Sequence, residues 1–445
     1  GISGKRSNMK FFNWYTKTPL IVLNIAAFLS GCAAGLLIWE IGDMGFSNLS
    51  AHIVTGMEPF GNILISMLKM IVIPIIFCSL VDGASSLPVR QFGKMGVSVI
   101  LWYIATSLFA AIFGCIIAMI CNPSLRNADM LASSMLDRVD AMQHPAGTVF
   151  PPMLSHFYNL FMNPFQALAE ARFLPLIVFS ILLGLAARLI FDTATDKSVS
   201  GSVSTLLDGI RGFQHIVFKI TDWVMRYFPI GIFALSAVCF AKFGITLFSS
   251  YFQVAISVIA GITLMILVCY PAIIFLICRE NPYRILWAIR EPIITAFAAR
   301  SSAASLPVSM RTAVEKLHIE PSLSGFTLSL GATVNMDGVC IHLPVFAVLA
   351  ANLFGFTIGP WQVFLLVVSV VFASIGAGGV PGGSIFLLFL VLDCFQLTPE
   401  QSAFIVSLAL GINPLLDMFE TACNVAGDNI GTYVIGKKLK LIRTE

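Results

Sequence analysis

The sequence predicts an all-α, polytopic membrane protein, and composition, apolar segment length and two interrupted apolar segments support that prediction. Of the 445 residues, 58% are hydrophobic and only 11% are Asp, Glu, Lys or Arg, whereas soluble domains carry about 25% charged residues. The mean hydropathy is +0.90. So few polar residues cannot coat a soluble protein of this length, so the composition excludes a cytosolic globular enzyme and a disordered chain.

Apolar segments of about 20 residues, long enough for a helix to cross a bilayer, recur along the chain. They are expected at about residues 20–39, 60–81, 97–120, 213–240 and 252–278, with a proline-broken region at 150–190. Lys and Arg precede the first segment and follow the last. By the positive-inside rule both termini are expected in the cytoplasm, which requires an even number of crossings. The net charge of +3 forms no basic stripe for nucleic acid.

Two later apolar segments are interrupted by small polar residues. One interruption is Ala-Arg-Ser-Ser-Ala-Ala-Ser at 299–305, and the other is Ser-Ile-Gly-Ala-Gly-Gly-Val-Pro-Gly-Gly-Ser at 374–384. Non-helical backbone survives at membrane depth only where it is buried in protein or lines a wet cavity. Paired interruptions indicate a transporter binding site, so we expect two re-entrant helical hairpins. Ordinary glycine-rich helix packing is the alternative.

The last apolar segment carries an unusual polar face. At about 100° per residue, one side of a helix would present Asp417, Glu420, Thr421, Asn424 and Asp428. Each charge at mid-bilayer costs about 2.5–3.5 kcal/mol on the insertion scale. Bound ions, a cationic group of a substrate, or protons must therefore compensate the carboxylates, unless this helix end is simply solvated.

A second polar cluster, Gly331-Ala-Thr-Val-Asn-Met-Asp-Gly338, lies inside an apolar stretch. Its glycines and closely spaced Asn335 and Asp337 favour an unwound turn, whose carbonyls and carboxylate suit a small cation such as Na⁺. A kinked helix in which Asn335 bonds to the backbone is the alternative. Further oxygens are available at i, i+3 and i+4 from Tyr103, Thr106 and Ser107.

Taken together, these motifs resemble the glutamate transporter superfamily of sodium-coupled dicarboxylate and amino acid symporters. The resemblance covers the chain from about residue 20 to the end. It rests on Lys69-Met-Ile-Val-Ile-Pro74, Arg300-Ser-Ser302, Asn335-Met-Asp337, Ala373-Ser-Ile-Gly376 leading to Gly379-Val-Pro-Gly382, and Asp417 through Asp428.

The resemblance implies roles for individual residues. Asp417 would bind the α-ammonium of an amino acid and Asn424 its α-carboxylate. The other implied substrate-binding residues are Ser301, Ser302, Met336, Gly379, Glu420 and Thr421. Sodium would bind at three sets of residues: Gly331, Asn335, Asn424 and Asp428; Thr333, Ser374, Ile375 and Ala377; and Tyr103, Thr106, Ser107, Asn335 and Asp337.

The resemblance also implies an architecture: a homotrimer in the lipid of the cell (inner) membrane, each subunit with eight transmembrane helices and two re-entrant hairpins. A scaffold (approximately 12–92 and 145–245) would hold a transport unit (approximately 95–121 and 250–437). That unit would slide as an elevator, with hairpin one at about 284–310 and hairpin two, the gate, at about 360–395.

One departure bears on the substrate. Acidic-substrate members carry an arginine where this chain has Glu420, and facing carboxylates repel. Small neutral hydroxylated amino acids such as serine and threonine are therefore favoured, because Glu420 and Thr421 resemble the bacterial serine/threonine members. Cationic amino acids (lysine, arginine, ornithine) are the alternative, and acidic substrates rank below both. Asn413 and Ala377 replace a common aspartate and a common threonine.

Two further residues have open roles. Arg300 could neutralise either Glu420 or Asp417, and His342 is interpreted as a packing residue, with a proton relay as the alternative. An intramembrane aspartyl protease is disfavoured because Asp417 and Asp428 share one helix, so no enzyme activity is expected. An ion channel is disfavoured because an amino-acid recognition set has no role in a simple pore.

Overall fold

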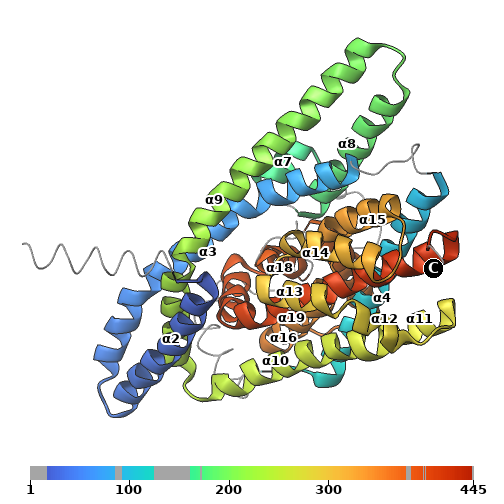
Figure 1. The fold of residues 1–445 in the computed structure, drawn as a ribbon. Coiled ribbons are helices and arrows are strands. Elements are labelled where there is room, and N and C mark those ends of the chain that lie inside the picture. Colours follow the sequence, from blue (N-terminus) through green and yellow to red (C-terminus); the bar gives the residue numbers. More distant parts are fainter. Residues whose placement is uncertain are drawn as a thin grey trace, which may run out of the picture.

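The computed structural model describes residues 18–85, 93–124, 161–170, 173–376, 382–393, 395 and 397–442. These residues form helices and their connections (Figure 1), and the only β-type pairing among them is an isolated bridge between Ile319 and Ile442. The all-helical class predicted from the sequence is therefore confirmed for the described part of the chain.

The N-terminal half contains the longest helices. Its elements are α2 (Leu20–Asp43), α3 (Ser47–Ser85), α4 (Gly93–Cys121), α7 (Pro164–Ala169), α8 (Phe173–Thr193) and α9 (Lys197–Phe243). The predicted apolar segments at 60–81 and 213–240 are too short, because α3 and α9 begin about one to two dozen residues earlier. Asp196 caps the start of α9 by accepting a hydrogen bond from the Ser198 amide at 2.8 Å, which stabilises a helix end where the sequence is still polar.

The C-terminal half is built from shorter, interrupted helices. Its elements are α10 (Thr246–Leu264), η1 (Met265–Cys269), α11 (Tyr270–Cys278), α12 (Pro282–Ala288), α13 (Arg290–Ala299), α14 (Ser302–Glu315), α15 (Pro321–Val334), α16 (Asp337–Phe354), α17 (Pro360–Gly376), α18 (Gly383–Asp393) and α19 (Pro399–Leu439). Across the described residues, eight helical segments are long and apolar enough to cross a membrane.

Helix α9 packs against α2 and α3, and α8 packs against α3 and α9 (Figure 1). Glycines set how closely they approach. A Cβ atom added to Gly35 on α2 would lie 2.5 Å from the Ala237 carbonyl oxygen on α9, and one added to Gly231 on α9 would lie 2.4 Å from the Leu64 side chain on α3. Small residues at these positions let the backbones come into direct contact, as is common in membrane helix packing.

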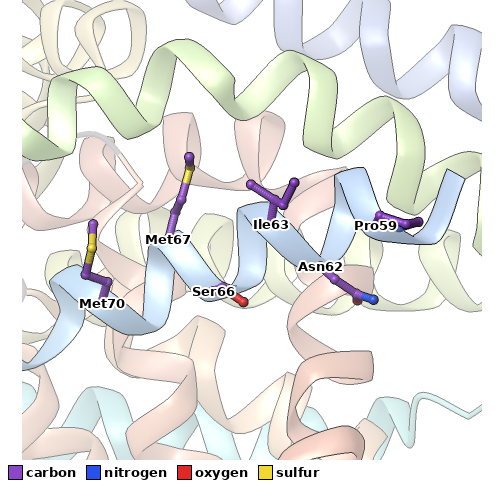
Figure 2. A pocket seen from close by; sticks show the side chains of 6 residues that line it. All are labelled: Pro59, Asn62, Ile63, Ser66, Met67 and Met70. Carbon is purple, nitrogen blue, oxygen red and sulfur yellow. The ribbon is translucent and has the colours of Figure 1, made fainter.

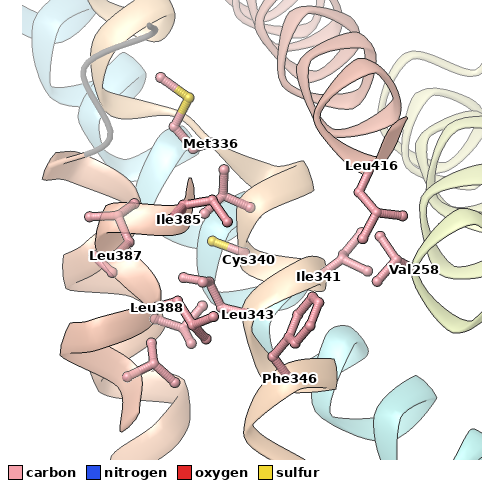
Figure 3. Packing of buried hydrophobic residues seen from close by; sticks show 14 of the residues in the cluster. Val258, Met336, Cys340, Ile341, Leu343, Phe346, Ile385, Leu387, Leu388 and Leu416 are labelled. Atoms are coloured by element: carbon pink, nitrogen blue, oxygen red, sulfur yellow. The ribbon is translucent and has the colours of Figure 1, made fainter. Parts of the chain in front are cut away.

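A second group consists of α4 and the helices from α10 to α19, with α16 near its centre. Cys340 and Leu343 of α16 face Ile385 and Leu388 of α18, while Ile341 faces the side where α10 and α19 lie (Figure 3). Because α16 is surrounded by protein, its polar residues are removed from both lipid and water.

Two helix interruptions lie where the sequence predicts them. Between α13 and α14, Arg300 adopts a left-handed conformation (φ 55°), and the Ser301 side chain caps α14 by accepting from the Ala304 amide at 3.2 Å. Between α15 and α16, Asn335 and Met336 leave the helical conformation. The third interruption separates α17 from α18, and most of it (377–381) lies outside the described residues.

An apolar groove on α3 is unconnected with these interruptions. Figure 2 shows its lining, Pro59, Asn62, Ile63, Ser66, Met67 and Met70, which come from that single helix. No residue of the predicted site is among them, so this groove is not the candidate site.

Candidate functional site

The polar face predicted for the last apolar segment lies on α19. Its five members, Asp417, Glu420, Thr421, Asn424 and Asp428, are all buried. They follow one another at intervals of three or four residues, except for adjacent Glu420 and Thr421, and therefore share one side of the helix. Each carboxylate must find compensation inside the protein or from a bound ion, because an isolated buried charge is very costly.

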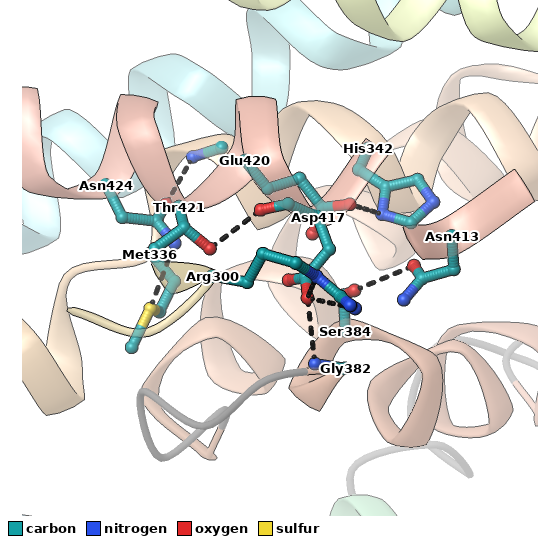
Figure 4. Close-up of polar contacts among 11 residues, drawn as sticks. Arg300, Met336, His342, Gly382, Ser384, Asn413, Asp417, Glu420, Thr421 and Asn424 are labelled. Atoms are coloured by element: carbon teal, nitrogen blue, oxygen red, sulfur yellow. Dashed lines mark hydrogen bonds and ion pairs between the residues drawn. The ribbon is translucent and has the colours of Figure 1, made fainter. Parts of the chain in front are cut away.

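At one end of this face, which we call the hairpin end after the two predicted hairpins, residues from two helix interruptions meet Asp417 (Figure 4). Arg300, at the tip between α13 and α14, places Nε 2.9 Å and Nη2 2.7 Å from Oδ2 of Asp417. The Gly382 amide, next to the start of α18, donates to the same oxygen at 3.0 Å. All three contacts converge on Oδ2, so Oδ1 of Asp417 takes part in none of them.

Glu420 lies one helical turn further along and meets a different side chain, a histidine. His342 Nδ1 on α16 is 2.6 Å from Glu420 Oε1, and each side chain is only 1% exposed. Of the two partners the sequence allowed for Arg300, the structure therefore places it on Asp417. The interpretation of His342 as a packing residue is incomplete: its ring does pack edge-on against Phe346, with centroids 4.9 Å apart, but it also faces Glu420.

The middle of the face ties α19 to the break between α15 and α16. Asn424 Oδ1 accepts from the Gly338 amide at 2.7 Å, and Nδ2 lies 3.2 Å from the Met336 sulfur. A Cβ atom on Gly338 would come within 2.4 Å of the Glu420 carbonyl oxygen, so only glycine permits this approach. Thr421 donates its hydroxyl proton to the Asp417 carbonyl at 2.7 Å.

At the other end of the face, Asp428 of α19 and Asp337, the first residue of α16, form a second group of buried carboxylates. Asn335 Nδ2 donates to Asp428 Oδ1 at 3.1 Å, and Tyr270 donates to Asp337 Oδ2 at 2.7 Å. Ser107 lies 3.5 Å from Asp337 Oδ1. The partners of both carboxylates are thus hydroxyl and amide groups.

The predicted oxygen ligands of α4 and α15 converge on this second pair. Thr106 donates to Asn335 Oδ1 at 3.1 Å, and Tyr103 donates to the Thr327 carbonyl at 2.7 Å. A Cβ atom on Gly331 would lie 2.4 Å from Asp428 Oδ1 and 2.6 Å from the Tyr103 hydroxyl. Carboxylate, carbonyl, amide and hydroxyl oxygens gathered in a dry site form a donor set suited to a hard cation.

The remaining predicted residues are only partly placed. Ser302, the first residue of α14, is buried near Arg300. In the second predicted sodium set, Thr333 and Ser374 donate to carbonyls of their own helices, α15 and α17, which touch each other. Ile375 is the penultimate residue of α17. Gly379 and Ala377 lie outside the described residues.

The sequence analysis missed Tyr270 and left His342 and Gly338 without a site role. Tyr270 is a single tyrosine within the apolar segment at 252–278, so no local spacing distinguishes it from a packing residue. Asn413 was noted as a replacement, and in the structure it accepts from Ser384 of α18 at 3.3 Å. This bond links α18 to α19 close to Asp417.

Comparison with known proteins identifies the family. The model of the sodium:dicarboxylate symporter family matches residues 20–438. The human neutral amino acid transporter B(0) is 29% identical over 448 residues, covering 94% of this chain and 79% of the transporter. Excitatory amino acid transporter 3 from Oryctolagus cuniculus is 28% identical, covering 96% of this chain and 86% of its own length.

A bacterial relative is similar to the same degree. The serine/threonine transporter SstT from Acinetobacter baylyi is 30% identical over 382 residues, covering 86% of this chain and 90% of the transporter. The resemblance drawn from the motifs is thereby confirmed, and the chain belongs to the sodium:dicarboxylate symporter family.

Proposed function

We propose that this protein is a sodium-coupled symporter of small neutral hydroxylated amino acids, with serine and threonine as its substrates. The observation that carries the proposal is the environment of Glu420. Where acidic-substrate members place an arginine, this chain buries a carboxylate beside His342, while the nearby Arg300 is already paired with Asp417. A second negative charge from an aspartate or glutamate side chain would be repelled there.

The substrate would bind between the two hairpins and α19. Its α-ammonium would pair with Asp417 through Oδ1, which the contacts of Arg300 and Gly382 leave available. Its α-carboxylate would accept from the Asn424 amide, which rests on the Met336 sulfur, a weak acceptor. The side-chain hydroxyl would then lie toward Glu420, which accepts its proton in a hydrogen bond. Similarity to a serine/threonine transporter supports the same substrate class.

Sodium ions would bind as co-transported substrates at the Asp337 and Asp428 end. Among the described residues, the hydrogen-bond partners of these two buried carboxylates are neutral, so cations would lower the cost of burying them. Binding would order the Asn335–Gly338 turn and, through the bond between Gly338 and Asn424, preset the substrate-binding amide. Sodium and substrate then favour the same closed arrangement, which is what coupling requires.

Transport itself would follow an elevator mechanism in a homotrimer. The group of α2, α3, α8 and α9 would be the static scaffold, and the group built around α16 and α19 the moving unit. Helices α13–α14 and α17–α18 would act as re-entrant hairpins, with α17–α18 as the gate held on Asp417 through Gly382. Both termini would lie in the cytoplasm, consistent with the distribution of Lys and Arg.

Uptake of labelled L-serine into proteoliposomes tests the proposal. The expected result is accumulation under an inward sodium gradient, none when potassium replaces sodium, and competition by unlabelled threonine but not by lysine or aspartate. The Asp222→Asn variant, altered at an exposed carboxylate on α9, should behave like the wild type. Strong competition by aspartate would show that the interpretation of Glu420 is wrong.

A second substrate class, cationic amino acids, is favoured by one observation. Glu420 Oε2 has no hydrogen-bond partner among the described residues, so a lysine or ornithine ammonium would find an acceptor there. Uptake of labelled lysine, together with no uptake of labelled serine, would replace the first proposal by this one.

A further inference from the structure

The strongest unexplained feature of the site is the contact between His342 and Glu420. The two side chains come from different helices, α16 and α19, and are 1% exposed. Their closest atoms, Nδ1 and Oε1, are 2.6 Å apart, a separation shorter than the usual N–H···O distance. Within the described part of the chain, neither ring nitrogen of His342 and neither oxygen of Glu420 has a hydrogen-bond partner, so the contact is a close approach of the two groups and not an aligned hydrogen bond.

Charge arithmetic requires one proton on this pair. Breaking a buried ion pair so that one charge stands alone costs about 3–5 kcal/mol, and Glu420 has Asp417 one turn away on α19. Arg300 does not offset Glu420, because its Nε and Nη2 both address Asp417. The charged groups that face Glu420 from α16, from the hairpin tip and from α19 itself are therefore His342, Arg300 and Asp417. Arg300 and Asp417 cancel, which leaves His342 as the partner of Glu420.

We propose that His342 is a positioning residue that sets side-chain selectivity by pairing with Glu420 so that the two buried side chains carry no net charge. The pair is neutral whether His342 is protonated and Glu420 ionised or both side chains are uncharged. A substrate therefore meets, at Glu420, a polar group without net charge behind it. Such a group can hydrogen-bond to a hydroxyl. Its interaction with an ammonium is too weak to offset the large free-energy cost of removing that charge from water. This inference rests on the proposed serine/threonine function and assigns its selectivity to a residue outside the substrate contacts.

Selectivity in three variants tests the inference. His342→Gln removes the basic partner but keeps a polar side chain, so an ionised Glu420 is no longer balanced and is expected to favour a cationic substrate group. Lysine and ornithine should then inhibit labelled serine uptake at concentrations at least about tenfold lower than in the wild type. The gain should be absent in Glu420→Gln and in the double variant His342→Gln/Glu420→Gln. A matched control is His52→Gln, which alters an exposed histidine on α3 and should leave competition unchanged.

A residue that merely fills space would behave differently. If His342 acts only by packing against Phe346, His342→Gln would weaken serine uptake without admitting cations, and the double variant would be worse than either single one. Unchanged lysine competition in His342→Gln, or an equal gain in the double variant, overturns the inference. Strong lysine competition already in the wild type also overturns it.

Thermal unfolding without substrate separates this inference from the proposed function. Each single variant leaves one buried group unpaired, whereas the double variant leaves a neutral pair, so the double should melt at a higher temperature than the less stable single variant. Residues in contact are expected to show such coupling. Additive losses would show that the two side chains do not form a pair. This cycle decides the pairing even if the wild type transports no serine.

Discussion

Two buried carboxylates lie at each end of the α19 polar face, and the side chains that contact them differ between the two ends. At the hairpin end, Asp417 faces Arg300 and Glu420 faces His342. At the other end, Asp337 and Asp428 face hydroxyl and amide groups. All four carboxylates are buried, so burial does not distinguish the two ends. The ends differ in whether the neighbouring side chains are basic or neutral.

This difference would allow one helix to serve both kinds of proposed cargo. Where basic side chains face the carboxylates, a substrate would compete with or add to existing contacts. Where the described partners are neutral hydroxyl and amide groups, compensation would come from a bound cation. Asn424 and Gly338 connect the two ends through a single hydrogen bond of 2.7 Å.

The largest effect is expected from removing the compensated charge at the hairpin end. Asp417→Asn leaves Arg300 buried without its partner, which costs about 3–5 kcal/mol of unfolding free energy, and it abolishes the ammonium contact. Uptake should fall below detection and the melting temperature should drop. The double variant Arg300→Met/Asp417→Asn should recover most of the melting temperature and none of the uptake. Equal stability of the single and double variants would argue against the ion pair.

A smaller effect, on the sodium dependence of uptake, is expected at the end that contains Asp337 and Asp428. Asp428→Asn keeps the size of the side chain and removes one charge that a cation would neutralise. Charge-assisted contacts contribute about 1.5–3 kcal/mol, so the sodium concentration for half-maximal uptake should rise by about 30-fold. Uptake measured against sodium concentration gives this value. An unchanged sodium dependence would place the ion elsewhere.

The connection between the ends is expected to be sensitive to a single methyl group. Gly338→Ala places a Cβ atom 2.4 Å from the Glu420 carbonyl oxygen, and such overpacking costs about 1–3 kcal/mol. The matched control is Gly209→Ala on α9, where nothing lies within 4 Å; it should stabilise by about 0.5–1 kcal/mol, because alanine is the better helix former. Thermal unfolding of both variants measures the contrast. The same sign for both would remove the steric argument.

The smallest effect is expected where water screens the charges. Glu280, 36% exposed, bonds to Lys437 and Tyr433, and these hydrogen bonds hold the pKa of its carboxyl below the usual value. A lowered folded-state pKa stabilises the protein above the unfolded pKa of about 4.3, and that contribution is lost as the pH falls through the folded value. Glu280→Gln should therefore cost less than about 1 kcal/mol at pH 7, and the loss should shrink as the pH falls below about 4.3 and disappear below the lowered folded-state pKa. A loss that persists in acid would assign Glu280 a role other than charge.

The sequence predicts the helical class, the break at Asn335 and Met336, and the polar face of α19, because each follows from local periodicity or local backbone preference. The sequence does not predict which basic side chain contacts which carboxylate. Arg300 is equally placed in sequence to meet Asp417 or Glu420, and the outcome depends on how the α13–α14 tip crosses α19. His342 and Tyr270 join the site across 78 and 67 positions of sequence, to Glu420 and Asp337, and only packing brings such residues together.

Helix lengths show the same limit. Hydropathy identifies the apolar parts of α3 and α9. It does not predict their more polar N-terminal extensions, which begin at Ser47 and Lys197. These extensions depend on capping and on contacts between the long helices.

The most direct test of the contrast between the two ends is the melting temperature of the purified protein as sodium replaces potassium, measured for the wild type, Asp417→Asn and Asp428→Asn. A ligand that binds only the folded state raises the melting temperature with its concentration. The account predicts a sodium-dependent rise in the wild type and in Asp417→Asn, and a much smaller one in Asp428→Asn. A full rise in Asp428→Asn, or its loss in Asp417→Asn, would contradict the separation of the two ends.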